Sequence, residues 1–393
     1  MEKIGIYGGT FNPPHTGHIH AAKQAVQRLN LDKLLMIPDR IAPHKEIPAG
    51  SPSPEQRMQM LKLAAGEEPW IEISDIELKR EGPSYTYLTV EALREQYPDA
   101  KLYLLMGTDM FLSFESWKEP QRITDHAVLA VMYRGDKGEA KAIAERKAQM
   151  EEQGVEVELI QNETIAISST QLRRLLAFRC ADGFLPAGVG EYIREYGLYD
   201  TAANWKNLPM EQLEPIVIRL LNPNRVAHVL GCRDTAVKLA RHWGADVTDA
   251  AGAGILHDIT KALDGPLQLT LCEAYGKILN TFSRKYPKTL HALTGSLVAD
   301  RIFGENEAVV SAICHHTTGK AGMTLLEKII YVADYIEPNR TIPGVEKLRE
   351  LAYTDIDAAL KLGLEMTLEH LNRQGAEVSP ESREALEFLE NRS

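Results

Sequence analysis

The chain has little of what would place it at once in a class of secreted or membrane proteins. Its cysteines are few and form no CxxC pair: they are Cys180, Cys232, Cys272 and Cys314. A chain of 393 residues does not need disulfides to compensate for a small core. No stretch approaches the ~20 apolar residues of a membrane span, and residues 1–30 lack the continuous apolar segment of a signal peptide. We therefore expect a soluble cytoplasmic protein with free thiols.

Basic residues are also in deficit. Lys and Arg number 44 against 55 Asp and Glu, which gives a net charge of −11 and a pI near 5.6. Bulk electrostatics thus give no support for non-specific binding to nucleic acid or to an anionic membrane. Positive charge must instead be local, at phosphate sites. The sequence leaves open whether the protein is a homo-oligomer.

The two halves of the chain differ in hydrophobic pattern. Over residues 1–199, short apolar runs alternate with helical segments, which predicts an α/β domain with a parallel sheet and helices on both faces. Residues 200–212 are polar enough to indicate a linker, and residues 213–393 carry apolar residues at helical spacing, which predicts an all-α domain. The expected strands are 4–7, 34–38, 70–74, 101–106, 127–133 and 155–159. The expected helices of the second half are 211–221, 226–243, 248–257, 290–303, 305–314, 325–336 and 345–374.

The most informative motif is GGTFNPPHTGH, which spans residues 8–18 between the first expected strand and a helix. Gly8 and Gly9 let the backbone approach a polyphosphate, because a Cβ there would collide with the ligand. The start of a helix directs free N–H groups and partial positive charge at the anion. His15 and His18 add donors that can become cationic. This order of features predicts a phosphate-binding loop.

A second run with anion-binding character is ISSTQLRR, residues 167–174. Ser168, Ser169 and Thr170 precede a helix, where hydroxyl groups can cap the helix and expose N–H groups to phosphate. Arg173 would deliver a forked cation one turn later. A plain N-cap explains the hydroxyl residues equally well.

These two runs resemble the HxGH nucleotidyltransferase superfamily, and the first is most similar to bacterial nicotinate-nucleotide adenylyltransferases. Pro43-His44-Lys45 resembles the PHK loop of that family, and Ser84-Tyr85-Thr86 resembles its SYT segment. The segment that begins at Gly107-Thr108-Asp109 and includes Phe111, Phe114 and Trp117 resembles its GTDxFxxFxxW segment. The family commonly continues SYT with x-Asp-Thr-Leu, whereas this chain has Leu88 in place of the aspartate. The resemblance covers the first half of the chain.

The resemblance implies a Rossmann-like nucleotidyltransferase domain that transfers AMP from ATP, with Mg²⁺, to nicotinate mononucleotide, giving deamido-NAD⁺ and pyrophosphate. It implies ATP-binding residues Gly8, Gly9, Thr10, Phe11, His15, His18, Ser168, Ser169, Thr170 and Arg173, of which His15, His18 and Arg173 act in catalysis together with Lys45. It implies nicotinate-nucleotide-binding residues Lys45, Tyr85, Thr86, Gly107, Asp109, Trp117 and Arg134. An aromatic face suits a flat ring better than it suits pantetheine. Nicotinamide mononucleotide and phosphopantetheine remain alternative acceptors.

The second half contains histidines and aspartates at long, irregular intervals. They are His228, His257-Asp258, His291, His315-His316 and Asp334, on separate expected helices. Each alone is more often a capping or solvated residue. Together, imidazoles and carboxylates from several helices are how helical bundles build metal sites, and six ligands can hold two ions if one carboxylate bridges.

This ordered set resembles the HD-domain phosphohydrolase superfamily, and the runs RxxHxxG, HDxxK, HTTG and IYxADxIEPxR resemble its symmetrical diadenosine tetraphosphate hydrolases. The resemblance implies hydrolysis of diadenosine tetraphosphate to two ADP at a di-iron centre, although the same ligands also suit manganese, zinc or cobalt. It implies one metal held by His228, His257, Asp258 and Asp334, with Asp258 bridging to a second metal held by His291 and His316. Lys261 and Arg340 would contact phosphate. Another nucleotide phosphohydrolase or a non-catalytic nucleotide-sensing module remains an alternative.

Overall fold

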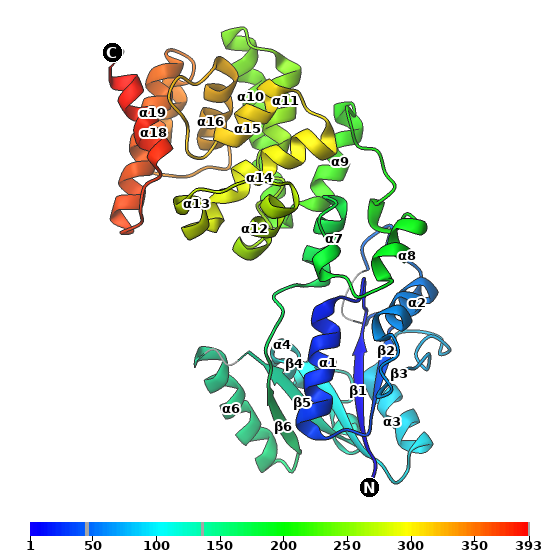
Figure 1. Ribbon diagram of the computed structural model, residues 1–393. Helices are drawn as coiled ribbons and strands as arrows, with labels where there is room; N and C mark the ends of the chain where they lie inside the picture. Colours follow the sequence, from blue (N-terminus) through cyan, green and yellow to red (C-terminus); the bar gives the residue numbers. More distant parts are fainter. Residues whose placement is uncertain (44–46, 135–136, 392–393) are drawn as a thin grey trace. The chain divides into compact units, whose positions relative to one another are not determined.

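A computed structural model describes residues 1–43, 47–134 and 137–391 (Figure 1). The chain forms two units, Met1–Ala202 and Ala203–Ser393. The division falls inside the segment 200–212 that the sequence predicts as a linker, although Trp205 is buried and stacks on Phe303 within the second unit. All four cysteines are free. Among the helices described, none is both long and apolar enough to cross a membrane.

The first unit is built on one parallel sheet of six strands in the order β3-β2-β1-β4-β5-β6. The strands are β1 (Lys3–Gly9), β2 (Lys33–Pro38), β3 (Ile71–Ile73), β4 (Lys101–Gly107), β5 (Ala127–Tyr133) and β6 (Val157–Gln161). Each predicted apolar run overlaps one of these strands, so the predicted α/β fold class is confirmed.

Helices cover both faces of the sheet because the strands are apolar on both sides. Leu34 and Met36 face one core, together with α1 (Thr16–Leu29) and α2 (Pro54–Ala65). Leu35 and Ile37 face the other core, which the remaining helices between β3 and β6 cover. These helices are α3 (Thr86–Gln96), α4 (Thr108–Leu112), α5 (Pro120–Thr124) and α6 (Lys137–Glu152). After β6 the chain forms α7 (Ser169–Ala177) and α8 (Val189–Glu195).

The strand order reverses between β1 and β4, which are hydrogen-bonded neighbours with Ile4 opposite Leu102. In sheets of this kind ligands bind beyond the carboxyl ends of the strands, at the point where connections leave in opposite directions. The loops after Gly9 and Gly107 leave the sheet at this point. The sheet topology therefore places two of the predicted nucleotide-binding segments at one edge.

The second unit is helical, as predicted, and has no strand among its described residues. Its helices are α9 (Met210–Leu220), α10 (Val226–Trp243), α11 (Val247–Leu256), α12 (Gly265–Ala274), α13 (Thr281–Lys285), α14 (His291–Val298), α15 (Glu307–His315), α16 (Leu325–Ile336), α17 (Val345–Leu351), α18 (Ile356–Arg373) and α19 (Pro380–Glu390). In its interior α10 packs against α11 and α16, and α15 packs against α14 and α16.

One helix prediction in the second unit is wrong. The single helix expected over 345–374 is two helices, because Asp355 accepts hydrogen bonds from the backbone of Asp357 and Ala358 and so begins α18 anew. A side chain that caps a helix competes with continuation of the preceding one. Helices α12, α13 and α19 lie outside the segments that the sequence analysis names, although an all-α domain was expected over this region.

Candidate functional sites

The loop from Gly8 to His18 ends at α1 with two stacked imidazoles. His15 precedes the first residue of α1, and its backbone N–H donates to Nδ1 of His18 at 3.1 Å. The two ring centroids lie 3.6 Å apart. A Cβ on Gly17 would approach Nδ1 of His15 to 3.0 Å, so glycine makes room for this stack. Because Nδ1 of His18 accepts, its Nε2 carries the proton of the neutral ring.

Both imidazoles are uncharged near neutral pH. Burial lowers the pKa of His15 to about 4. Burial, reinforced by His15, holds the pKa of His18 well below its usual value. The cationic form that the sequence suggests would therefore require a bound anion. Nδ1 of His15 is buried and has no hydrogen-bond partner among the described residues.

The run 168–173 folds against the first loop. Ser169 Oγ donates to the carbonyl of Pro13 at 3.0 Å, and Arg173 Nη1 donates to the carbonyl of Asn12 at 2.7 Å. Ser168 caps α7 by accepting from the N–H of Gln171, as the plain N-cap interpretation predicts. The two runs predicted to bind phosphate are far apart in sequence, and these contacts bring them together near the N-termini of α1 and α7.

Arg173 and Thr170 are linked to each other, since Nη2 of Arg173 donates to Thr170 Oγ1 at 3.1 Å. Burial lowers the pKa of Arg173. The guanidinium is half-buried beside the loop, where it would be a forked donor for an anion.

A buried arginine that the sequence did not single out holds the glycine loop. Arg57 on α2 is fully buried and pairs with Asp39 at 3.1 Å, and its Nη1 also donates to the carbonyl of Thr10 at 2.6 Å. Thr10, predicted to contact phosphate, donates its hydroxyl to Asp39 Oδ2 at 2.7 Å. The loop is therefore rigidly tied to β2 and α2.

Phe11 and Tyr199 support the loop from behind. The Phe11 ring is 2 % exposed and lies edge-on to Tyr7 and His18, so a contact with ATP would have to come from its backbone. The Tyr199 hydroxyl donates to Asn12 Oδ1 at 2.8 Å in a buried contact. No sequence signal pointed to Tyr199.

The residues predicted for the nicotinate nucleotide lie at the starts of helices. Tyr85 precedes Thr86, the first residue of α3, and Gly107 precedes α4, whose first turn carries the exposed Asp109. The Lys118 ammonium lies 4.9 Å from the centre of the Tyr85 ring, which brings the segment after α4 to the start of α3.

The other predicted acceptor residues are only partly placed. The half-buried Trp117 ring packs on Phe114 in the core, with centroids 5.4 Å apart. Arg134 is exposed and its N–H donates to Glu139, which also accepts from Thr108. Lys45 lies outside the described residues.

In the second unit the six predicted ligands converge in the interior. All are buried, and they come from the starts of α10 and α14, the ends of α11 and α15, and the last turns of α16. We call this set the His/Asp cluster; it consists of His228, His257, Asp258, His291, His316 and Asp334.

Asp258 is the shared member of the cluster. Its Oδ2 lies 3.7 Å from Nε2 of His228 and 3.6 Å from Nε2 of His257. Its Oδ1 lies 3.5 Å from Nε2 of His291 and 3.7 Å from Nε2 of His316. Asp258 thus belongs to two groups of three residues, one with His228 and His257 and the other with His291 and His316. Within each group the possible ligand atoms all lie within 4.8 Å of one another. One carboxylate thus faces two groups of imidazole nitrogens with its two oxygens.

Asp334 joins the group of His228 and His257, with its Oδ1 at 3.1 and 4.0 Å from their Nε2 atoms. His315, the neighbour of His316 that the resemblance does not assign as a ligand, does not join the cluster. Its Nδ1 contacts the carbonyl of Ser311 at 2.8 Å.

The protonation of the cluster suits a metal site. Burial lowers the pKa of His257 to about 4 and that of His291 to about 3, so these rings are neutral. Burial opposes ionisation of Asp258, but His257, His316, His291 and Lys261 together hold its pKa well below the usual value. Neutral imidazoles and ionised carboxylates are the forms that bind metal. The donor set therefore fits divalent cations.

Three cations surround the cluster. Arg340 Nη2 donates to Asp334 Oδ1 at 2.7 Å, and Lys261 Nζ donates to Nε2 of His291 at 2.8 Å. Arg225 pairs with Asp258 and keeps 30 % of its side chain exposed. Lys261 and Arg340 were predicted, whereas Arg225 was not, although it begins the RxxH run.

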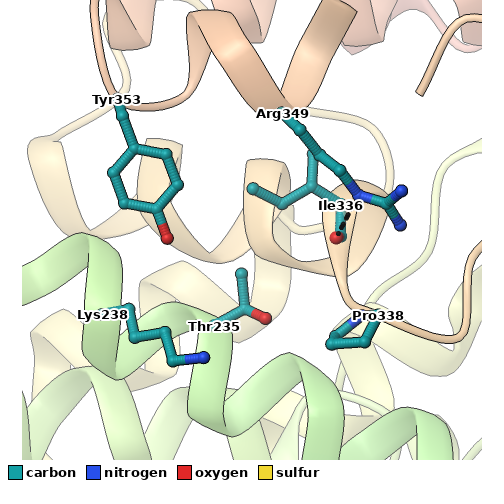
Figure 2. A pocket seen from close by; sticks show the side chains of 6 residues that line it. All are labelled: Thr235, Lys238, Ile336, Pro338, Arg349 and Tyr353. Carbon is teal, nitrogen blue, oxygen red and sulfur yellow. Dashed lines mark hydrogen bonds between the residues drawn. The ribbon is translucent and has the colours of Figure 1, made fainter. Parts of the chain in front are cut away.

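A surface pocket of about 390 Å³ lies beside the end of α16, where Ile336 and Pro338 contribute to its lining. Figure 2 shows the residues that line it. Two of them are linked, because Arg349 donates to the carbonyl of Ile336 at 3.1 Å. None of the His/Asp cluster lines this pocket.

The comparisons with known proteins divide in the same way as the fold. Residues 6–175 match the cytidylyltransferase-like family and residues 225–339 match the HD domain. A probable nicotinate-nucleotide adenylyltransferase of Neisseria meningitidis serogroup C / serotype 2a is 35% identical over 202 residues, covering 51% of this chain and 100% of the relative. That of Aeromonas salmonicida is 40% identical over 214 residues, covering 50% of this chain and 96% of the relative.

Two solved structures are each similar to about half of the chain. A predicted HD superfamily hydrolase involved in NAD metabolism from Clostridium acetobutylicum is 35% identical, with a TM-score of 0.46, and covers 47% of this chain and 99% of its own. Nicotinic acid mononucleotide adenylyltransferase of Plasmodium falciparum, complexed with NaAD, is 20% identical, with a TM-score of 0.42, and covers 51% of this chain and 98% of its own.

Proposed function

Because the chain belongs to the nicotinate-nucleotide adenylyltransferase family through its N-terminal half and carries an HD domain in its C-terminal half, we propose that it is a bifunctional enzyme. The first unit transfers AMP from ATP to nicotinate mononucleotide, which gives deamido-NAD⁺ and pyrophosphate. The second unit hydrolyses diadenosine tetraphosphate to two ADP.

The joint site of residues 8–18 and 168–173 is the observation that supports adenylyl transfer. A phosphate oxygen of nicotinate mononucleotide attacks the α-phosphorus of ATP, and the bond from that phosphorus to the β-phosphate oxygen breaks as pyrophosphate leaves. The attacking phosphate is already ionised near neutral pH, so no general base is required. The work that remains for the protein is positioning and charge stabilisation.

The chain's residues can do that work as hydrogen-bond donors. The neutral His18 offers its Nε2–H, and Arg173 offers the guanidinium held at Asn12. Mg²⁺ bound with ATP would supply the additional positive charge. Tyr85 and Trp117 would provide aromatic surface for the nicotinate ring, with Thr86, Gly107, Asp109 and Arg134 around the acceptor and Lys45 near the phosphates.

Parallel assays with three acceptors test this activity. Nicotinate mononucleotide, nicotinamide mononucleotide and phosphopantetheine are each supplied with ATP and Mg²⁺, and pyrophosphate release is measured. We expect the nicotinate form to be preferred. Equal turnover of the three acceptors, or preference for another, would refute the acceptor assignment.

The two-sided arrangement of Asp258 is the observation that supports metal-dependent hydrolysis. His228, His257, Asp258 and Asp334 would hold one divalent ion, and Asp258, His291 and His316 would hold a second, which we propose to be iron in both positions. Ions bound there would lower the pKa of water and stabilise charge on phosphate oxygens.

The surrounding cations give this site its preference for a polyphosphate. Lys261, Arg340 and Arg225 all place positive charge at the edge of the cluster. In the reaction, the oxygen of one water forms a bond to one of the two central phosphorus atoms. The bond between that phosphorus and the oxygen bridging the two central phosphates breaks, and each half leaves as ADP.

Release of ADP from diadenosine tetraphosphate tests this activity, with metal content measured on the same preparation. The wild-type chain is compared with a His257→Ala/Asp258→Ala variant. We expect ADP release and bound metal in the wild type, and loss of both in the variant. Equal background rates in both proteins would refute the hydrolase, and elemental analysis decides between iron and manganese, zinc or cobalt.

A further inference from the structure

One histidine of the His/Asp cluster has a different hydrogen-bond partner at Nδ1 from the other three. Nδ1 of His257 and of His316 each contacts a backbone carbonyl three residues earlier, at 2.8 and 2.7 Å, and Nδ1 of His291 contacts that of Lys288 at 3.1 Å. His228 instead places Nδ1 3.1 Å from Oε1 of Glu337, which follows the last residue of α16. A carboxylate replaces the carbonyl at this one ligand.

Glu337 is itself fixed. It is 1 % exposed, and its Oε2 accepts from the backbone N–H of Asn339 at 2.8 Å and from Asn339 Nδ2 at 2.9 Å. Asn339 is tied in turn to α10 through the carbonyl of Ala227 at 3.1 Å. With Oε2 occupied, Oε1 is the oxygen that faces His228.

The helix opposite leaves space for this carboxylate. A Cβ on Gly231, one turn after His228 in α10, would lie 2.6 Å from Glu337 Oε2. Arg349 anchors the same turn by donating to the carbonyl of Glu337 at 3.1 Å. The glycine of the RxxHxxG run therefore serves the approach of Glu337.

We propose that Glu337 is a positioning residue for the metal site, an inference that rests on the proposed function of the His/Asp cluster. By accepting from Nδ1–H, it fixes the tautomer of His228 in which Nε2 has a free lone pair. Nε2 of His228 lies 3.1 Å from Asp334 Oδ1 and 3.3 Å from His257 Nε2, so these three atoms are placed to share one cation. A carboxylate on the far nitrogen also fixes the orientation of the imidazole, as such partners do for metal-binding histidines.

The variant Glu337→Gln reverses this hydrogen bond with little change in size. Two N–H groups of Asn339 face the Oε2 position, so the amide oxygen should lie there and the amide NH₂ should face His228. Nδ1 would then have to accept, and the proton would move to Nε2, where it blocks metal binding. We expect Mn²⁺ affinity to fall on the order of 10- to 100-fold.

The experiment is a Mn²⁺ titration of the full-length chain after its metal has been removed with a chelator. The signal of free Mn²⁺ is monitored by electron paramagnetic resonance. The tautomer is read from ¹⁵N shifts of labelled histidine. Glu327→Gln is the matched control, because Glu327 is a buried glutamate of α16 that pairs with Lys320 at 2.7 Å and contacts none of the cluster. We expect it to lose stability and keep its Mn²⁺ affinity.

Gly231→Ala is a second variant, which displaces the carboxylate without removing it and keeps the question answerable if Glu337→Gln does not fold. We expect weaker Mn²⁺ binding there as well. If a folded Glu337→Gln chain binds Mn²⁺ with wild-type affinity, the role of Glu337 is overturned and the metal site is not. The same conclusion follows from Gly231→Ala if only that variant folds. Failure of the wild-type chain to bind Mn²⁺ would overturn the metal site and this role with it.

Discussion

Both units bury histidines, but the ring nitrogens of these histidines have different surroundings in the two units. In the first unit the rings of His15 and His18 stack at the start of one helix, and Nδ1 of His15 has no partner among the described residues. In the second unit each histidine of the cluster is anchored through Nδ1 and turns Nε2 toward Asp258 or Asp334. In the proposed function, the residues of the first site donate hydrogen bonds to an anion. The second site contains two carboxylates, and its donor set fits cations.

The largest expected effect separates the two units completely. Asp258→Ala removes the carboxylate that both imidazole groups face, and with it a proposed ligand of both metal ions. ADP release from diadenosine tetraphosphate should therefore fall on the order of 1,000-fold, because the charge stabilisation that the metals would supply is lost. Formation of deamido-NAD⁺ should stay within about twofold, because that site needs no group of the cluster. Both products are measured on one preparation. A parallel loss of both activities would contradict the separation.

Arg57→Met should destabilise only the first unit. The change leaves Asp39 buried without its cation and frees the carbonyl of Thr10, and breaking such a buried pair costs about 3–5 kcal/mol. Hydrogen exchange followed by mass spectrometry resolves the two units in one chain. Faster exchange confined to the first unit is expected; unchanged exchange over the glycine loop would show that Arg57 does not hold it.

His18→Ala should sharpen the comparison from the other side. Loss of its Nε2–H donor is expected to lower the rate of deamido-NAD⁺ formation about 100-fold. The rate of ADP release should not change. His20→Ala is the matched control, since His20 lies on the same helix outside the loop, and adenylyl transfer should survive that change.

The buried histidines should make the stability of the chelator-treated protein depend on pH. Burial lowers the pKa of His15 and His257 to about 4 and of His291 to about 3, so the unfolded chain binds protons that the folded chain does not. Their contribution is complete above pH 6.5 and is lost as the pH falls toward 4, by up to about 1.4 kcal/mol per pH unit for each histidine. Urea unfolding at pH 7.5, 6.5 and 5.5 measures the slope. Equal stability at all three values would contradict it.

Tyr199→Phe is expected to have the smallest effect. It removes one buried hydrogen bond to Asn12 and should cost about 1 kcal/mol of stability in the first unit. Hydrogen exchange of the segment 8–18 should increase slightly. The second unit is the internal control, and an equal change there would refute a local role for Tyr199.

Contiguous patterns carried most of what the sequence could predict. The apolar runs located the six strands of the sheet, most clearly the central ones, because a strand buried on both faces must be apolar throughout. The edge strands β3 and β6 also carry exposed residues, Glu72 and Glu158 among them. The segment 8–18 stood out because its residues act next to one another. In the second half, six separated residues were recognised only as an ordered set, and the fold brings them together.

What the sequence could not predict depends on contacts between distant segments. Arg57 lies in a helix where an arginine ordinarily faces water, and only the position of Asp39 explains its burial. Glu337 is part of a recognised run, yet its role appears only when Asn339 and Gly231 are seen beside it. The break between α17 and α18 depended on a cap at Asp355.

In the proposed function, one carboxylate, Asp258, joins two metal positions in the second unit. The most direct test is the number and coupling of Mn²⁺ ions bound to the wild-type chain, measured by electron paramagnetic resonance. The shared carboxylate predicts two ions per chain that are magnetically coupled, as expected for ions about 3.5–4 Å apart. A single ion, or two ions without coupling, would contradict it.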